Sequence, residues 1–415
     1  MRPELPYFLN DVVGIGGALK QRPEDFRVTE LPAYTPSGDG EHLLIEIEKT
    51  GLSTFEAIDT VAKRLNVPRR DIGYAGLKDA NAVTRQWLSV RGTTLDCVDA
   101  AASNDLKILF VEPHRNKLRV GHLRGNRFSV RVREVDPMKV VTLAPAIATL
   151  VRRGMPNYFG EQRFGRRDQN DALGLAYARR DADEVLSLLL GRPDDGDGEA
   201  ERAARTAYDD GDIAKAYALW PRRDRDEAAA LRRLLDGKSP ADVVAAVDRR
   251  IVELWLSALQ SRMFNSVVAA RLVALDELVE GDLSFKHDNG ASFRVTDVET
   301  ERVRVAPFEI SATGPIFGSR MTPPTGEAAM IERTALVDAG LPEDAVASVY
   351  EPGAGRDAPA WLGGLGPGAR RPLRVRPDGL RTEAGIDEHG PYIQFDFTLP
   401  PGAYATTLLR EFMRA

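Results

Sequence analysis

The stretch from Tyr74 to Trp87 reads YAGLKDANAVTRQW, and it places Lys78 and Asp79 side by side. The segments at either end of it, residues 71–75 and 86–91, are typical of strands, so the pair is expected in a loop between two strands. An adjacent lysine and aspartate are usually two solvated surface charges. Their role here therefore depends on what the rest of the chain brings to this loop.

Strands are expected to dominate the first 150 residues around this loop. Some segments alternate apolar and polar residues, as half-buried strands do. A capping box at Ser53–Glu56 begins a helix with one apolar face, and that helix is expected to end before Pro68. The further expected strands are residues 26–31, 42–48, 107–112 and 127–134. This part of the chain is therefore predicted to be α+β.

The character of the chain changes after about residue 155, where helical spacing begins. Residues 248–272 have the apolar pattern of a long amphipathic helix. Residues 292–308 are strand-like, and residues 352–372 are rich in Gly and Pro and are expected to form a linker.

The C-terminal end resembles the N-terminal end. RRPLRVR and YIQFDFTLP are expected strands, and a short helix is expected from about Tyr404. We predict one strand-rich domain with a mixed or antiparallel sheet, built from residues 1–154 and 368–415. A helix-rich insertion, residues 155–367, would interrupt it.

The composition is that of an ordinary globular protein, with 43% hydrophobic and 28% charged residues among 415. No apolar run approaches the roughly 20 residues that a membrane span needs, and the first residues do not form a signal peptide. Cys97 is the only cysteine, which excludes disulfides and cysteine metal clusters and favours the cytoplasm. The five histidines lack ligand-like spacing, so no metal is expected.

The net charge of −6 does not suggest a polyanionic partner, but the basic residues gather in three tracts. Arg115–Arg133 holds seven Lys or Arg and no acid. Arg152–Arg167 and Arg370–Arg381 each hold five arginines and one acid. On charge alone, a nucleic-acid-binding face and ordinary arginine-rich strands are equally supported.

YAGLKDANAVTRQW resembles the signature of the TruD-type tRNA pseudouridine synthase family, an aromatic residue followed by A-G-x-K-D-x-x-A-x-T-x-Q. Other segments are similar to that family, in the family's order and over nearly the whole chain. They are LKQRPEDFRVTE (19–30), PSGDGEHLLIEIEKTGLST (36–54), HRNKLRVGHLRGNRFSVRVRE (114–134), GMPNYFGEQRFG (154–165), ATGPIFG (312–318) and LPPGAYATTLLREF (399–412).

The resemblance implies a fold, a reaction and a partner. The fold would be a strand-rich pseudouridine synthase domain interrupted by an inserted α/β TruD-type domain. The reaction would be conversion of a tRNA uridine, at position 13, to pseudouridine, with an aspartate catalyst and no cofactor. The partner would be tRNA, with no membrane or protein partner implied, and a monomer is the default.

The resemblance also assigns roles to residues, each with a structural alternative. Asp79 matches the catalytic aspartate, whose alternative is a surface charge. Residues expected around the target base or the carboxylate, with core, turn or solvated alternatives, are Lys20, Phe26, Asn126, Phe128 and Tyr404. Lys78 is expected to contact the RNA backbone or form a structural ion pair. Thr84 and Gln86 are expected to brace the loop by hydrogen bonds, and Arg410 to face the carboxylate.

Two alternatives remain open. The chain could be a non-catalytic RNA-binding or tRNA-folding protein that keeps the fold. It could also be a glycosidase or nucleosidase acting on a small substrate, with Glu24 and Asp25 available as a carboxylate pair. Ala80 and Asn81 stand where the family often has a basic residue and His, which bears on contacts to the RNA and on the choice of tRNA.

Overall fold

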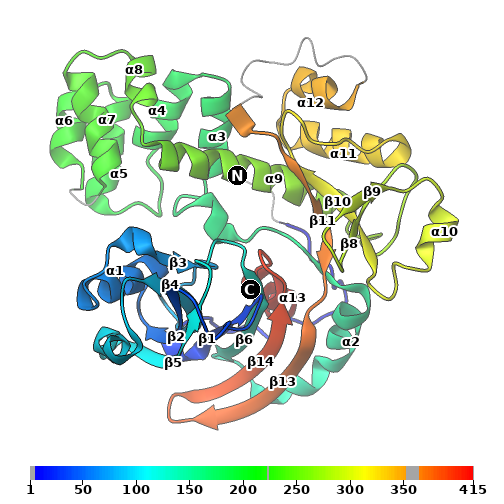
Figure 1. Ribbon diagram of the computed structural model, residues 1–415. Coiled ribbons are helices and arrows are strands. Elements are labelled where there is room, and N and C mark those ends of the chain that lie inside the picture. The colour runs from blue at the N-terminus through cyan, green and yellow to red at the C-terminus, as the bar shows by residue number, and fades with distance from the viewer. Residues whose placement is uncertain (1–4, 222–223, 352–363, 415) are drawn as a thin grey trace. The chain divides into compact units, whose positions relative to one another are not determined.

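The computed structural model describes residues 5–221, 224–351 and 364–414, and the chain divides into two compact units (Figure 1). We call Tyr7–Asn157 with Arg374–Ala415 the sheet unit. Tyr158–Leu373, with the first six residues of the chain, is the helix unit. The domain boundaries expected after residues 154 and 367 stay a prediction about how the functional domains divide.

The sheet unit is built on one mixed sheet that uses both ends of the chain. Within the described residues it has eight strands in the order β13-β14-β6-β1-β4-β2-β5, with β3 paired to β4. Only the β1–β4 pair is parallel among these pairings. The strands are β1 Phe26–Pro32, β2 His42–Thr50, β3 Ile72–Tyr74, β4 Val83–Arg91, β5 Leu106–His114, β6 Leu123–Arg133, β13 Asp378–Asp387 and β14 Gly390–Leu399. The predicted α+β class with a mixed sheet is confirmed.

Short helices and one small strand pair complete the sheet unit. The helices are α1 Thr54–Arg64, α2 Ala144–Arg153 and α13 Ala405–Met413, with 3-10 turns η1 Pro23–Asp25, η2 Arg69–Asp71, η3 Leu95–Ala101 and η4 Pro137–Thr142. The strand pair is β7 Met155–Pro156 with β12 Arg374–Val375. The predicted capping box of α1 is confirmed, because Ser53 Oγ accepts from the Glu56 amide and the Glu56 carboxylate accepts from the Ser53 amide.

The apolar face of the sheet packs against α1 and forms a core between them. Leu43, Ile45 and Ile47 of β2 are buried on one face of the sheet, and they pack with Ile58 and Val61 of α1. The capping box and this apolar face together explain why α1 forms here. The strand-to-strand loop that carries Asp79 lies next to this packed layer, between β3 and β4.

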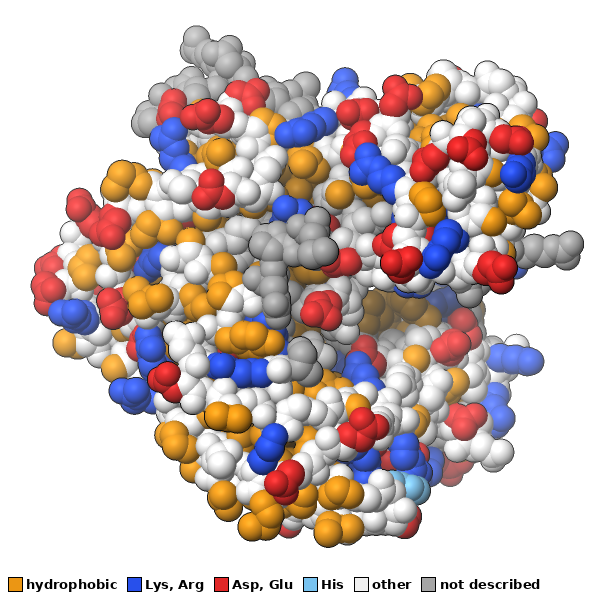
Figure 2. Space-filling model, turned by 180° about the vertical axis from the view of Figure 1, so that it is seen from behind, with side chains coloured by type: hydrophobic (Ala, Val, Ile, Leu, Met, Phe, Trp, Pro, Cys, Tyr) orange, Lys and Arg blue, Asp and Glu red, His pale blue; other side chains and the backbone are white. Residues whose placement is uncertain are grey.

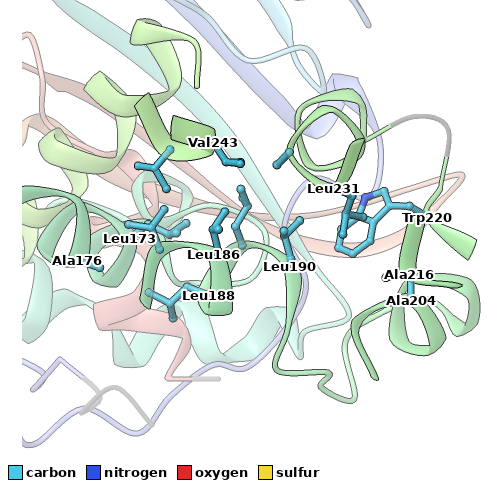
Figure 3. Packing of buried hydrophobic residues seen from close by; sticks show 14 of the residues in the cluster. Leu173, Ala176, Leu186, Leu188, Leu190, Ala204, Ala216, Trp220, Leu231 and Val243 are labelled. Atoms are coloured by element: carbon cyan, nitrogen blue, oxygen red, sulfur yellow. The ribbon is translucent and has the colours of Figure 1, made fainter. Parts of the chain in front are cut away.

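The helix unit packs helices around a separate core. Buried side chains between residues 173 and 255 gather in one apolar cluster, of which Leu173, Leu186 and Leu231 are labelled in Figure 3. These elements are η5 Glu161–Phe164, α3 Asn170–Ala178, α4 Ala182–Leu190, α5 Glu199–Asp209, α6 Ile213–Leu219, α7 Arg225–Leu235, α8 Pro240–Ala245 and α9 Arg249–Ala270. The long helix predicted over residues 248–272 is confirmed as α9.

A second part of the helix unit has four strands in the order β11-β10-β8-β9 within the described residues. Its elements are β8 Leu283–Lys286, β9 Ser292–Arg294, α10 Val298–Arg302, β10 Ile310–Ile316, α11 Gly326–Asp338, α12 Glu343–Tyr350 and β11 Ala369–Pro372. The strand expected over residues 292–308 is wrong beyond Arg294. Asp297 caps the amides of Glu299 and Thr300 and begins α10 instead.

The expected linker over residues 352–372 is only partly described. Residues 352–363 lie outside the described residues, and the last four residues of the range form β11. No helix in the described ranges has the length and apolarity to cross a membrane.

Candidate active site

Asp79 lies in the β3–β4 loop with its side chain 40% exposed. Lys20 Nζ is 2.5 Å from Asp79 Oδ2 and 4.5 Å from the centre of the Phe26 ring. The Lys20 backbone has a φ of 55°, a conformation uncommon for a residue with a side chain. Its carbonyl accepts from Asn81 Nδ2 at 3.1 Å, so the Asp79 loop itself holds Lys20 in place. The structure therefore brings Lys20, Phe26 and Asp79 together.

The Lys49 side chain anchors the backbone of the Asp79 loop by a hydrogen bond. Its side chain is fully buried at the end of β2, and its ammonium donates to the backbone carbonyls of Leu52 at 2.5 Å and Asp79 at 2.9 Å. Burial lowers the pKa of Lys49 to about 8, although the attraction of Asp79 opposes this shift. The backbone of Asp79 is thus fixed by a group that costs free energy to bury.

Lys78 points the other way and forms a buried ion pair. Its Nζ is 2.5 Å from Glu30 Oε2, and the two side chains are 5% and 0% exposed. Glu30 Oε1 also accepts from the Trp87 amide at 3.2 Å. Burial raises the pKa of Glu30, and Lys78 opposes that rise. Of the two roles left open for Lys78, the structure shows the structural ion pair.

Gly76 makes room for this pair. A Cβ at Gly76 would lie 2.9 Å from Lys78 Nζ, so a side chain there would require the Lys78 ammonium to move from its position beside Glu30. The spacing G-x-K in the motif therefore has a steric reason, because Lys78 folds back over the glycine to reach Glu30.

A chain of hydrogen bonds braces the loop from α1. The Lys78 amide donates to Thr54 Oγ1 at 2.9 Å, and Thr54 Oγ1 donates to Gln86 Oε1 at 3.1 Å. The bracing role predicted for Gln86 is thus seen. The same prediction for Thr84 is wrong, because its hydroxyl, buried in β4, has no partner among the described residues.

Phe26 and Phe128 contact each other at the start of β1 and in β6. Their ring centres are 6.2 Å apart in an edge-to-face arrangement, and Phe128 also stacks on Phe397 of β14 at 5.2 Å. Phe26 is 3% exposed and Phe128 is 7% exposed. Both are therefore largely core residues, and Phe26 is the one in contact with the Lys20–Asp79 pair through Lys20.

Asn126 and Tyr404 are carried by neighbouring elements. Asn126 of β6 is paired with Glu30 of β1 and with Leu399 of β14. Its Oδ1 is buried and has no hydrogen-bond partner in the described part of the chain. Tyr404 is the N-cap residue of α13, five positions after the end of β14. Strand pairing thus brings the C-terminal segment to the element that carries Asn126.

Arg410 contacts the ring of Tyr7. Its guanidinium lies 4.2 Å from the centre of the Tyr7 ring. The expectation that Arg410 faces Asp79 stays a prediction.

Sequence reasoning missed Lys49 and Glu30, although a signal was present. In β2, Lys49 lies an even number of positions from Leu43 and Ile47, so it points to the same buried face of the sheet. In β1, Glu30 points to the same buried side as Phe26. A charged residue at an inward position of an alternating strand must find a buried partner. Such a position therefore marks a residue with a specific structural or functional role.

Many arginines of the three basic tracts are engaged within the protein. Arg133 makes a buried pair with Asp25 and a second with Asp387, and the latter holds the pKa of Asp387 well below its usual range. Other tract members in ion pairs are Arg115, Arg131, Arg166, Arg167 and Arg370. On the face in Figure 2, basic and acidic side chains are interspersed among the coloured residues. Tract charge is therefore a poor guide to where a nucleic-acid-binding face would lie.

Comparisons with known proteins show which family the chain is similar to. The family model described as tRNA pseudouridine synthase D (TruD) matches residues 3–412. The chain is 42% identical over 412 residues to a tRNA pseudouridine synthase D of Geotalea daltonii, covering 99% of this chain and 100% of that one. It is 43% identical to one of Geobacter sulfurreducens, with 98% and 96% covered.

A solved structure is similar over the same length. A crystal structure from Methanosarcina mazei, assigned as tRNA pseudouridine synthase D (TruD), superimposes with a TM-score of 0.81 at 26% identity. The match covers 99% of this chain and 96% of the other.

Proposed function

We propose, from the premise that this chain belongs to the tRNA pseudouridine synthase D (TruD) family, that Asp79 is the carboxylate with which it converts a tRNA uridine to pseudouridine. The family makes the chain an isomerase acting on tRNA. The observation that carries the role of Asp79 is its setting. Its backbone is fixed by Lys49 and its carboxylate is paired with Lys20, yet its side chain is still 40% exposed to a substrate.

The reaction balances without a cofactor. The N1–C1′ bond of uridine breaks, the uracil turns, and a C5–C1′ bond forms. The C5 hydrogen leaves as a proton and N1 gains one, so nothing is oxidised or reduced. Asp79 would act at the sugar–base bond, by attack on the ribose or the base or by stabilising positive charge on the sugar.

Asn126 would hold the edge of the extruded uracil. Uracil presents an N3–H donor between two carbonyl acceptors, and the Asn amide presents an acceptor and a donor. The buried Asn126 Oδ1, without a partner among the described residues, is free to accept from N3–H. Tyr404 and the edge of Phe26 would contact the base, with Phe128 supporting Phe26.

The proposal also covers the target uridine, which is position 13 by resemblance, and the cellular compartment and oligomeric state of the enzyme. Cys97 is an exposed free thiol, which suits a reducing cytoplasm. We place the enzyme there as a monomer with tRNA as its partner. Transcripts in which cytidine replaces uridine 13 should release no tritium, whereas release at the native level would refute that target.

Tritium release from tRNA labelled at uridine C5 tests the catalytic role. Asp79→Asn should lower the rate at least about a thousandfold, equivalent to about 4 kcal/mol in the barrier. Its affinity for tRNA should stay within about threefold, since Asn conserves shape. Asp99→Asn, an exposed aspartate in the same unit, is the matched control and should keep the native rate. An affinity loss as large as the rate loss would make Asp79 a structural residue.

The same experiment addresses the two alternatives. Binding of tRNA without release from any transcript would favour the non-catalytic RNA-binding protein. The nucleosidase alternative has lost its proposed carboxylate pair, because Asp25 is 1% exposed and held by Arg133 through both oxygens.

A further inference from the structure

A recess of about 280 Å³ lies in the sheet unit, where β5 ends and β6 begins. Its walls come from the segment after β1 and from the β5–β6 connection. They are Tyr34, His114, Asn116, Lys117, Arg119 and His122. None of these residues is acidic, and none belongs to the site around Asp79. The recess is small for a whole drug-sized ligand and suits one group of a larger molecule.

Hydrogen bonds fix which ring nitrogen carries the hydrogen in each of the two histidines that line this recess. The Ser37 amide donates to His114 Nδ1 at 3.2 Å, and the Arg119 amide lies 3.4 Å from His122 Nδ1. An amide N–H can only donate, so both Nδ1 atoms are acceptors, and in each neutral ring the hydrogen is on Nε2. The Tyr34 hydroxyl, 2.7 Å from His122 Nδ1, donates in the same way.

Aromatic contacts make the cluster rigid. Tyr34 stacks on His114 with ring centres 5.2 Å apart and planes at 12°, and it meets His122 edge to face at 5.6 Å. Burial raises the pKa of Tyr34, which keeps its hydroxyl protonated, and burial lowers the pKa of His114. Each neutral ring therefore keeps an Nε2–H that can donate, and neither histidine needs to be charged for this.

The charges at the recess are both positive. Lys117 is anchored by its ammonium to the carbonyl of Arg70. Arg119 is exposed, and its guanidinium makes no ion pair among the described residues. Arg115, four positions earlier, is by contrast held by Asp39 through two nitrogens. Asp39 is the carboxylate whose charge reaches His114, and it is already paired with Arg115. Donors beside two cations, with no carboxylate among the lining residues, favour an anion.

We propose that this recess binds a backbone phosphate of the RNA, close to the target uridine. The inference rests on the proposed function, since it takes tRNA as the substrate. The recess is tied to the Asp79 loop, because the Gly121 amide donates to the Ala75 carbonyl at 2.8 Å. His122 is four residues before Asn126, a span of at most about 13 Å in a strand, or about four nucleotides of a stacked strand.

The test measures binding, so it does not depend on turnover. Labelled tRNA is titrated with native protein and with Arg119→Gln at pH 8 across a range of salt concentrations. Loss of one phosphate contact should reduce the slope of log K against log[salt] by about 0.7 to 0.9. His122→Asn keeps a polar group near Nδ1 but removes the Nε2–H, so it should weaken binding several-fold with the native slope.

Arg115→Gln is the matched control. It removes the same charge from the same connection, but that charge is already compensated by Asp39, so its slope should equal the native slope. A methylphosphonate at the contacted phosphate, within about four nucleotides of the target uridine, should weaken native binding and leave Arg119→Gln unaffected.

Two outcomes would overturn the inference. One is a native salt slope for Arg119→Gln, and the other is an equal loss for Arg115→Gln. Normal tritium release together with either outcome would reject the recess alone. Tritium release by Asp79→Asn would instead reject the catalytic proposal, while a reduced slope for Arg119→Gln would still support the recess.

Discussion

Removing Lys78 tests the buried ion pair that Lys78 forms with Glu30 beside the Asp79 loop. Lys78→Met keeps most of the volume but leaves Glu30 buried, fully shielded from water, with only the Trp87 amide as a hydrogen-bond donor. Breaking a buried pair by removing one partner costs about 3–5 kcal/mol, because the remaining charge is uncompensated. For a unit of this size, that corresponds to a melting temperature lower by roughly 6–20 °C.

The pH dependence of this loss has a definite sign. Burial raises the pKa of Glu30 above its ordinary value, and Lys78 opposes the rise, so the variant should have a still higher pKa in the folded state. A folded-state pKa above the unfolded value means that stability falls as pH rises from about 4.5 through the folded pKa. The deficit of Lys78→Met should therefore be smaller at pH 5 than at pH 7.5.

The assay is thermal unfolding at both pH values, with hydrogen exchange of β1 and β4 amides to localise the effect. Lys107→Met is the matched control, since Lys107 is 67% exposed in its pair with Glu48 and should change stability by at most about 1 kcal/mol. Adding Glu30→Gln to Lys78→Met should recover part of the loss. A deficit that is equal at both pH values, or larger at pH 5, would refute the reasoning.

Two further predictions concern the site itself. Lys49→Met should lower the single-turnover rate of pseudouridine formation about 10- to 100-fold, because the Asp79 carbonyl loses its donor and the carboxylate shifts. Lys107→Met is the control and should keep the native rate. A native rate for Lys49→Met would contradict this prediction. Asn126→Ala should lower kcat/KM about tenfold for each hydrogen bond to the base that is lost. Its melting temperature should be unchanged or higher, since the removed Oδ1 has no partner in the described residues. Parallel losses of activity and stability would count against a role of Asn126 in holding the base.

The fold class could be predicted because local patterns agreed with the final structure. The alternation in β1 and β2, the capping box of α1 and the periodicity of α9 are local signals, and each element formed where it was expected. The errors arose where tertiary pairing decided. β4 begins at Val83 rather than at residue 86, because residues 83–85 pair with β1.

The site was predictable in its polar residues and less so in their partners. The motif places Lys78 and Asp79 side by side, and the structure shows the expected contact of Asp79 with Lys20 and an ion pair of Lys78 with Glu30, a partner that was not predicted. Adjacent residues point in different directions, so sequence neighbours seldom share a partner. Phe26 and Phe128 were expected near the base, and the structure shows that both are largely buried.

The family, the strand-rich character of both ends and the motif around Lys78 and Asp79 could be recognised from the sequence, because contiguous residues carry them. The pairing of the charged side chains became visible only in the folded chain. Lys49 reaches Asp79 across 30 residues, and Lys78 reaches Glu30 across 48. Ion pairing falls steeply with distance and depends on burial, so it follows from strand order and register, which no local pattern contains.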